Sequence, residues 1–392
     1  MRKVYLLALG SFAIGTDTFV TAGVLPAISA DLHVPVAATG QLVTVFAVAF
    51  AVFAPVAAAL LAGAPRRTLL LSALALFAAA NLLSAVAPAF WVLLLSRVLA
   101  AAGAAAYTPT AAAGGAALVE PERRGRALAV VLGGVTAATV LGVPITAYVG
   151  MQLDWRVTFL VVAGLAVLAL AALALVLPAV PAPPPVGLRV RIGVLGDRQV
   201  LLAIVTTVLY YVGGFALYTY LAPALSGGGA VSASKIAGFL LVFGVAGLAG
   251  NALGGRLTDR IGPVPVLAGG LVAFAAALLL FPLASRSVAG TVAALAVWGV
   301  SAWALTVPQQ HRLMAFAPSA PAVAVGLNSS ATFLGIGLSG IVGGVALTRM
   351  GAAELGYLGG VLVLAALGVV ALQTVTSRRS AAAGAAEPAV RV

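Results

Sequence analysis

One acidic residue, Asp17, lies in the middle of the apolar stretch FAIGTDTFVTAGVLPAI, which covers residues 12–28. If this stretch is a membrane helix, Asp17 lies about 16 Å from its outer end. A carboxylate at that depth costs at least ~2.5 kcal/mol, unless it is protonated or has a cationic partner in a wet cavity. A group that can do either is able to carry a proton, and we expect this role. The alternative is a permanently protonated Asp17 that only bonds one helix to another.

Arg97 is the basic residue that falls inside an apolar run, about 9 Å from the outer end of residues 91–117. Its depth differs from that of Asp17 by about 7 Å, which is close to the reach of an arginine side chain. Two interpretations remain open: Arg97 pairs with Asp17, or it extends to the outer headgroups.

Both residues require membrane-spanning helices to hold them. The chain has 392 residues, of which 63% are hydrophobic and 8% are charged, whereas soluble domains carry about 25% charged residues. Its apolar runs are about 20 residues long, as a helix needs to cross the hydrocarbon. We therefore predict an all-α integral membrane protein with spans at residues 5–28, 40–63, 68–87, 91–117, 127–150, 157–178, 200–223, 235–255, 263–284, 291–316, 323–348 and 356–376.

The net charge of +12 follows these spans. With a cytoplasmic N-terminus, sixteen of the 21 lysines and arginines fall on inner segments and four on outer ends, with Arg97 inside a span. This bias is the positive-inside rule, and it predicts that both termini are cytoplasmic. The basic charge therefore indicates topology and no nucleic-acid partner, and we expect the chain to lie in the cell inner (cytoplasmic) membrane.

One connection is long and rich in proline: PAVPAPPPVGLRVRIGVLGDRQ, residues 178–199. Proline runs favour extended structure, so this segment predicts a linker between two halves of six spans. We expect an N-terminal bundle at 1–178, a cytoplasmic linker at 179–199, a C-terminal bundle at 200–376 and a disordered cytoplasmic tail at 377–392. Transporters built from two such halves bind substrate between them, near the middle of the membrane.

Several motifs resemble the major facilitator superfamily, and within it the twelve-span drug:proton antiporters. GGRLTDRIG (254–262) is similar to the family's loop motif, LSRVLAAAGAA (95–105) to its span-4 motif, and LGVPITAYVG (141–150) to the antiporter motif of span 5. GTDTFVTAGVLP resembles the span-1 signature of efflux members, including chloramphenicol exporters, and two later segments resemble purine-efflux and arabinose-efflux branches. Two positions differ: Ala62 stands where the first-half loop would carry aspartate, and Thr18 where many relatives carry the span-1 acid.

The resemblance implies a fold of twelve transmembrane helices in two six-helix bundles, with spans 1 and 4 adjacent. Arg97 would then favour the ionised form of Asp17 in one state and lose that influence in the other. The resemblance also makes Asp259 and Arg260 part of a state-dependent clamp, where the alternative is a solvated turn. Gly142 and Pro144 are gating candidates, because Pro144 is expected to kink span 5, as Pro308 is expected to kink span 10.

Polar and aromatic residues well inside the spans are candidate substrate contacts, since aromatic rings with a few polar anchors suit flat, partly hydrophobic solutes. Each of them could instead bond helices together or belong to the interfacial belt. The candidates are Thr21, Tyr107, Thr110, Tyr210, Tyr211, Tyr218, Trp298, Trp303, Gln309 and Asn328.

Other function classes lack the residues that they need. We find no phosphate-binding Walker loop, no cysteine, and only two histidines, His33 and His311, which are far apart; we therefore expect no cofactor and no metal site. No nucleophile–base pair and no metal cluster falls within the predicted spans, so a membrane enzyme or a non-transporting scaffold lacks support.

The sequence thus predicts a proton-coupled exporter of a small, partly hydrophobic drug or metabolite, which works by alternating access as a monomer in the lipid bilayer. The alternative is a passive facilitator or importer of a sugar or nucleoside, in which Asp17 only binds substrate. The solute itself stays open among amphenicols, purines or nucleosides, sugars and other drugs.

Overall fold

The computed structural model describes residues 1–61, 63–178, 193–194, 196–226 and 232–386. These residues form twelve helical segments that are long and apolar enough to cross a membrane, so the predicted twelve-span, all-α fold is confirmed. The spans of the first half are α1 (Arg2–Asp31), α3 (Gln41–Leu60), α4 (Arg66–Ala85), α5 (Phe90–Ala117), the combined α6, η2 and α7 (Arg124–Ala137, Ala138–Gly142 and Val143–Gln152) and α8 (Trp155–Val176).

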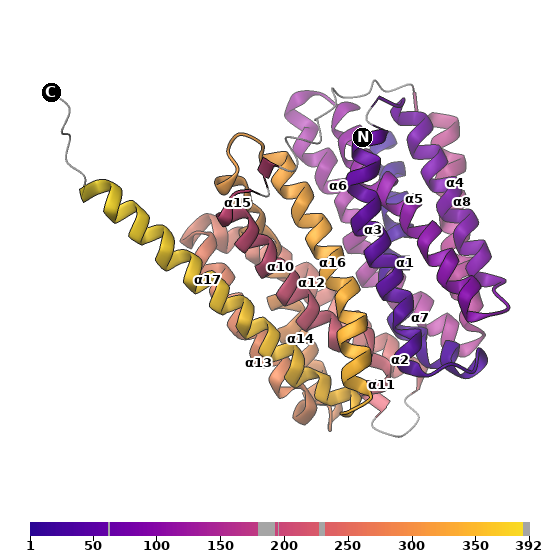
Figure 1. Ribbon diagram of the computed structural model, residues 1–392. Coiled ribbons are helices and arrows are strands. Elements are labelled where there is room, and N and C mark those ends of the chain that lie inside the picture. Colours follow the sequence, from indigo (N-terminus) through magenta and orange to yellow (C-terminus); the bar gives the residue numbers. More distant parts are fainter. Residues whose placement is uncertain (62, 179–192, 195, 227–231, 387–392) are drawn as a thin grey trace.

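The second half repeats this pattern on the other side of the molecule (Figure 1). Its spans are α10 (Arg198–Thr219), α12 (Ala233–Ile261), α13 (Pro263–Ala284), the pair α14 and α15 (Val288–Ala304 and Thr306–Phe316), α16 (Pro321–Leu347) and α17 (Leu355–Ala386). The short elements α2 (Val36–Thr39), η1 (Pro121–Arg123), α11 (Leu221–Ser226) and η3 (Ala352–Glu354) connect spans.

The predicted linker and tail are described only in part. Residues 179–192 and 195, which include the proline run, and residues 387–392 lie outside the described ranges. Span 7 begins at Arg198, slightly before the predicted residue 200. The last helix continues past residue 376 to Ala386, so part of the segment that we expected to be disordered is helical.

Polar side chains cap the first turns of several spans. The carboxylate of Asp154 accepts a hydrogen bond from the backbone N–H of Arg156 at 2.8 Å, and that of Asp197 accepts one from Gln199 at 2.7 Å. Ser287 caps α14 through the N–H of Gly290 at 3.0 Å. Because the first N–H groups of a helix have no partner within it, these side chains fix the starting points of spans 6, 7 and 10.

Two spans are interrupted near a proline. In span 5 the helix becomes a π-helix over Ala138–Gly142, directly before Pro144. In span 10 the helix stops at Ala304 and restarts at Thr306, with Pro308 in the first turn of α15. Proline has no N–H to donate to the carbonyl four residues before it, which is Val140 in one case and Ala304 in the other. The predicted effects of Pro144 and Pro308 therefore take the form of a π-helical stretch and a break.

The two halves share one hydrophobic cluster at the end of the molecule opposite the termini. Val20 and Leu25 of α1 belong to it together with Leu217 of α10 and Leu240 of α12. Near the termini, the described residues form separate clusters, one in the first half around Leu7 and Leu70 and one in the second around Leu313. The halves are therefore packed together mainly at the end away from the termini.

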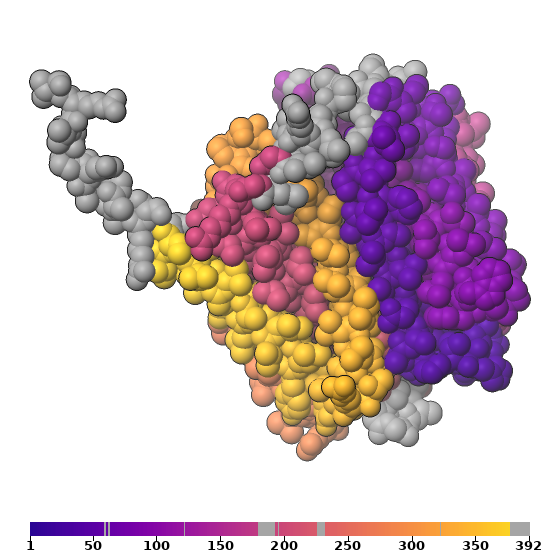
Figure 2. Space-filling view, in the orientation of Figure 1, coloured from indigo at the N-terminus to yellow at the C-terminus, as the bar shows by residue number. Residues whose placement is uncertain are grey.

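One side of this packing is the seam between α3 and α16. Figure 2 shows it where the orange of α16 meets the indigo of the first helices. Phe50 and Phe333 stack across the seam with ring centroids 3.7 Å apart, and beyond them Val56 and Leu60 of α3 are exposed. Apolar contact thus holds the two halves together for about half the length of α3.

Tyr220 links several elements at the end of the molecule opposite the termini. It lies between α10 and α11, and its hydroxyl donates toward the carbonyl oxygens of Ala37, at 3.2 Å, and Gly340, at 3.0 Å. Burial raises the pKa of Tyr220 to about 12, because a phenolate would lose its hydration. The hydroxyl is therefore a donor at every physiological pH.

Candidate functional site

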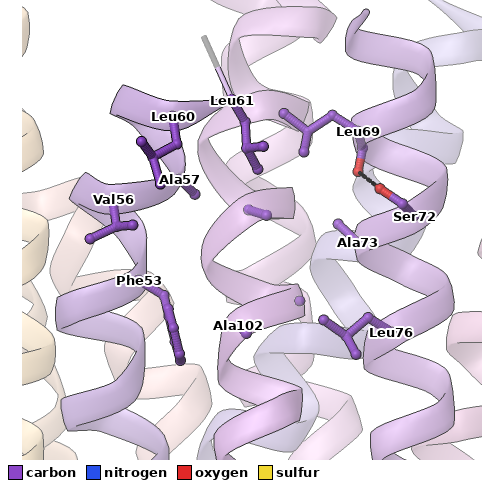
Figure 3. A pocket seen from close by; sticks show the side chains of 12 residues that line it. Phe53, Val56, Ala57, Leu60, Leu61, Leu69, Ser72, Ala73, Leu76 and Ala102 are labelled. Atoms are coloured by element: carbon purple, nitrogen blue, oxygen red, sulfur yellow. Dashed lines mark hydrogen bonds between the residues drawn. The ribbon is translucent and has the colours of Figure 1, made fainter. Parts of the chain in front are cut away.

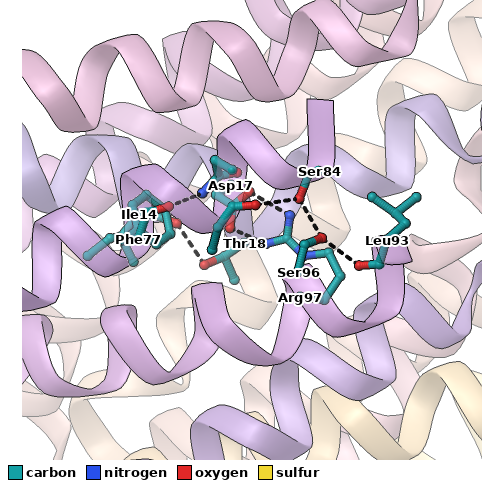
Figure 4. A network of polar contacts seen from close by, with 10 residues as sticks. Ile14, Asp17, Thr18, Phe77, Ser84, Leu93, Ser96 and Arg97 are labelled. Atoms are coloured by element: carbon teal, nitrogen blue, oxygen red, sulfur yellow. Dashed lines mark hydrogen bonds and ion pairs between the residues drawn. The ribbon is translucent and has the colours of Figure 1, made fainter. Parts of the chain in front are cut away.

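Asp17 and Arg97 meet inside the first half (Figure 4). The Nη1 atom of Arg97 donates to Oδ1 of Asp17 at 3.0 Å, and its Nη2 donates to Oδ2. Asp17 comes from the middle of α1, and Arg97 lies about two turns after the start of α5. Two parallel bonds of this kind form the fork geometry in which a guanidinium holds a carboxylate most firmly. Two interpretations of Arg97 were left open, and in this conformation Arg97 pairs with Asp17.

The pair is closed off from water in this conformation. Asp17 and Arg97 are each 1% exposed. The guanidinium carbon lies 5.0 Å from the ring centre of Phe46 on α3 and 5.3 Å from that of Phe159 on α8. Four helices therefore enclose the two charges, and the aromatic faces add cation–π stabilisation to Arg97.

A chain of serine hydroxyls lies beside Arg97. The hydroxyls of Ser84 on α4 and Ser96 on α5 are 2.7 Å apart, and Ser96 also donates to the carbonyl of Leu93 at 2.6 Å. One turn before Ser84, the amide nitrogen of Asn81 donates to Phe77, while its oxygen has no partner among the described residues. The interior of the first half thus holds a charge pair next to neutral polar groups.

Proton uptake at this pair has a large electrostatic consequence. The ionised pair has no net charge, but protonated Asp17 would leave Arg97 as a buried cation without its counter-charge. Removing one partner of a buried ion pair costs about 3–5 kcal/mol. Protonation therefore favours any conformation in which Arg97 reaches water or another acceptor. This arrangement is able to link the binding of a proton to a change of conformation.

Four of the substrate candidates lie along a row of aromatic rings that crosses between the halves. Tyr210 and Tyr211 are 4.9 Å apart, and the row continues through Phe215 to Tyr218 at 5.3 Å. Phe19 of α1 joins from the other half, 5.9 Å from Phe215. Trp298 stands edge-on to Tyr218 at 6.3 Å and is itself buried at 2% exposure. Of these rings, Phe19, Tyr211 and Phe215 are half-buried.

Gln309 and Asn328 belong to a polar network within the second half. Thr207 of α10 donates to the Oδ1 atom of Asn328 at 2.7 Å and accepts from Nε2 of Gln309 at 3.0 Å. The Oε1 atom of Gln309 accepts from Nη1 of Arg312 at 3.0 Å, and Nη2 of Arg312 donates to Oε1 of Gln373 at 2.6 Å. The network therefore joins α10, α15, α16 and α17.

The other substrate candidates are dispersed. Tyr107 is fully buried and donates to the carbonyl of Leu7 at 2.8 Å, which joins α5 to α1. Thr21 is buried one turn beyond Asp17, and Thr110 is half-buried and donates within its own helix to Ala106. Trp303 is half-buried against Gly247 of α12. The structure does not bring these four residues together.

The gating candidates lie in two places. Asp259 and Arg260 are exposed near the end of α12, just before Gly262, whose φ of 85° suits glycine. Gly142 ends the π-helical stretch, where a Cβ atom would run into the hydroxyl of Thr16 on α1. Gly142 therefore allows span 5 to lie against α1 directly beside Asp17.

A separate apolar groove lies on the first half between α3, α4 and α5 (Figure 3). It has a volume of about 490 Å³, and its lining includes Phe53, Leu60, Leu76 and Ala102. None of the predicted site residues lines it, and the exposed Leu60 and Leu76 place it on the surface of the spans. Within the described ranges, no group of three or more His, Cys, Asp or Glu side chains is arranged to hold a metal ion.

Arg312 is a polar residue that the sequence analysis missed, as are Thr207 and Gln373 of the same network. Arg312 was counted among the inner positive charges, yet it is 3% exposed and lies in the interior of the second half. The spacing of Gln309 and Arg312 was a signal, because residues three apart lie on one face of a helix. A cation that shares its face with a glutamine is better placed to bond inside a bundle than to meet headgroups.

Comparisons with known proteins agree with this architecture. A sequence model of the Major Facilitator Superfamily matches residues 7–339. The inner membrane transport protein YdhP of Escherichia coli K12 is 33% identical, over 90% of this chain and 89% of its own. The chloramphenicol resistance protein of Streptomyces lividans is 37% identical over 68% of each chain, and a probable sugar efflux transporter of Mannheimia succiniciproducens is 31% identical over 92% of this chain and 90% of its own. The chain therefore belongs to the Major Facilitator Superfamily and is a multi-pass membrane transporter, not an enzyme.

Proposed function

We propose that the protein exports a small, partly hydrophobic solute in exchange for protons by alternating access. The observation that carries this proposal is the buried pair of Asp17 and Arg97. Its neutrality depends on the charge of one carboxyl group, so gain or loss of one proton changes which conformation the first half prefers. Relatives named as a chloramphenicol resistance protein and a probable sugar efflux transporter support the outward direction.

The conformation described above corresponds to one of the two states of this transport cycle. With both termini in the cytoplasm, as the distribution of basic residues predicts, the halves are packed together at the outer end and have separate hydrophobic clusters toward the inner end. A solute would then enter from the cytoplasm. In the opposite conformation, Asp17 takes up a proton from outside and the solute leaves.

Energy from the membrane is sufficient for this exchange. One charge that crosses 100 mV supplies about 2.3 kcal/mol. A gradient of one pH unit adds about 1.4 kcal/mol per proton. Together they allow a concentration ratio of several hundredfold for one proton per neutral solute. The transporter then needs no nucleotide.

The solute is expected to contact the aromatic row and the polar network of the second half. Tyr211 is a half-buried ring of that row, while Asn328 retains 7% exposure at one edge of the network. Flat rings with a few polar anchors are suited to a solute that is partly hydrophobic. Asp259 and Arg260 would then act at the inner surface as a clamp between spans.

The proposal is tested in two steps. Amphenicols, purine nucleosides and sugars are screened for a rise in the melting temperature of the purified protein, and each hit is added to energised everted vesicles that contain a pH-sensitive dye. An antiporter releases protons from the vesicle lumen when its solute is added, so the dye reports a smaller pH gradient. A passive facilitator would carry the same solute and leave the pH gradient unchanged.

A further inference from the structure

Arg312 is a buried cation to which the described chain offers only neutral acceptors. Its two terminal nitrogens donate to the side-chain oxygens of Gln309 and Gln373, and its Nε atom has no hydrogen-bond partner among the described residues. Phe316 lies 5.7 Å from the guanidinium carbon. Arginine stays charged in proteins and carries five N–H donors, so this site has a full positive charge and donors to spare.

None of the acids that the structure describes pairs with Arg312. Each ion pair among the described residues involves Arg97, Arg123 or Arg156. The described acids of the second half, Asp197, Asp259 and Glu354, are exposed. Of the nine acids in the sequence, Glu387 is the one outside the described ranges, and it follows the end of α17. Residues 179–192 contain no acid at all.

The two buried arginines therefore differ in the charge of their hydrogen-bond acceptors. Arg97 has a carboxylate on the facing helix, whereas Arg312 has two amide oxygens in the corresponding role. A buried charge without a counter-charge is costly, and a ligand that brings the counter-charge recovers that cost. An oxyanion is the group that matches a guanidinium best, because it accepts two parallel hydrogen bonds.

The position of Arg312 also favours a ligand of the transport cycle. The residue is on α15, the short inner half of the interrupted span 10, which restarts after the break at Leu305. Discontinuous helices at membrane depth commonly form the binding sites of transporters, because the polar ends of their half-helices point at charged groups of the substrate. Through Gln309 the site connects to Thr207 and Asn328.

We propose that Arg312, with Gln309 and Gln373 as its supports, binds the carboxylate or another singly charged oxyanion of the transported solute. This inference rests on the proposed function, since it specifies the class of solute that the exporter carries. The preferred solutes are then aromatic or apolar acids, not their neutral amides. The aromatic row supplies contact for the ring, and Arg312 supplies the charge.

The test compares matched acids and amides as probes. Benzoate, salicylate and indole-3-acetate, and the amide of each, are titrated against the purified protein in nanodiscs of neutral lipid, with melting temperature as the readout. We expect at least one acid to bind about ten-fold more tightly than its amide. In Arg312→Gln the ratio falls to about one, and in Arg312→Lys, which keeps the charge but loses the fork, it is intermediate. Arg256→Gln, an exposed arginine of the same half, keeps the wild-type ratio.

Three outcomes would overturn the proposal. The acids and amides could bind equally, no acid could bind, or Arg312→Gln could keep the preference for acids. A separate arm replaces part of the neutral lipid with phosphatidylglycerol, without any probe. If this lipid alone raises the melting temperature of the wild type but not of Arg312→Gln, the oxyanion belongs to a lipid headgroup and the solute proposal is wrong. Failure of this test leaves proton exchange through Asp17 to be judged on its own assay, because that assay does not depend on Arg312.

Discussion

Arg97 holds both carboxylate oxygens of Asp17 with its two terminal nitrogens, although the two residues are 80 positions apart in the sequence. The contact joins spans 1 and 4 inside the first half, with both side chains removed from water. Because the pair is neutral only while Asp17 is ionised, a single proton changes its electrostatics completely. The predictions below follow from this pair and from the packing that surrounds it.

The pair is expected to be strongly coupled in stability. Arg97→Gln leaves a buried carboxylate unpaired, and we expect a loss of about 3–5 kcal/mol. The double variant Asp17→Asn with Arg97→Gln loses much less than the two single changes added together. Melting temperatures of all four proteins measure the coupling. Arg123→Gln is the control, because its pair with Glu120 is exposed and its loss has little effect. Purely additive losses at positions 17 and 97 would contradict the pairing.

The seam between α3 and α16 offers a direct test of the conformation. A Cβ atom placed at Gly340 lies 3.4 Å from the Cβ of Thr44, close to the separation of about 3.5–4.5 Å found in disulfides. The chain contains no cysteine, so Thr44→Cys with Gly340→Cys adds a single possible pair. We expect oxidation to form the disulfide and stop transport, and reduction to restore it.

Each single cysteine variant is the control for that experiment, since neither is able to form an internal bond. Transport by the single variants should not respond to oxidant. If the oxidised double variant transports at the wild-type rate, the seam between α3 and α16 does not need to open there, and the alternating-access scheme would be wrong.

Gly142 is predicted to be sensitive to the smallest side chain. In Gly142→Ala the new methyl group meets the hydroxyl of Thr16 and pushes span 5 away from α1 beside Asp17. Overpacking of this kind costs about 1–3 kcal/mol, so a lower melting temperature and slower transport are expected. Gly133→Ala in the same span is the matched control, because nothing lies within 4 Å of its Cβ position. Equal behaviour of the two variants would refute the close packing at Gly142.

Tyr220 gives a prediction about pH. Its phenol is held protonated in the folded state, so the stability that it contributes is complete below the ordinary pKa of 10.0 and is lost as pH rises through about 12. Between these values, wild type should lose more stability than Tyr220→Phe, which has no proton to release. At neutral pH Tyr220→Phe lacks the bonds to Ala37 and Gly340, so a cysteine introduced near residue 220 should react faster with a thiol reagent. Identical pH profiles would show that the hydroxyl is not a buried donor.

Much of the fold could be predicted because membrane spans leave strong signals in sequence. The apolar runs predicted twelve spans. The depths of Asp17 and Arg97, together with the adjacency of spans 1 and 4 that the family resemblance implies, predicted that the two could meet. The form of the interruptions was harder to predict. Pro144 and Pro308 both remove a hydrogen bond, but neighbouring packing decides whether the helix becomes π-helical or breaks.

The direction in which individual side chains point, into the bundle or out toward the lipid, could not be derived from the sequence. A span such as α13 is apolar on every side, so no polar face indicates which rings point inward. Tyr107 and Tyr211 both lie well inside spans, yet one is fully buried in the first half and the other is a half-buried ring of the aromatic row. Arg312 was missed for the opposite reason, because its position near the inner end of a span made it look like a topology signal.

The most direct measurement is transport by Asp17→Asn reconstituted in liposomes, with a solute that the screen identifies. Solute exchange without a pH gradient serves as the check that the carrier is folded and active. We predict that wild type accumulates solute when a pH gradient is imposed, whereas Asp17→Asn still exchanges solute measurably but no longer accumulates it. If Asp17→Asn accumulates solute against its gradient to the wild-type level, proton coupling does not pass through Asp17 and the proposed mechanism is wrong.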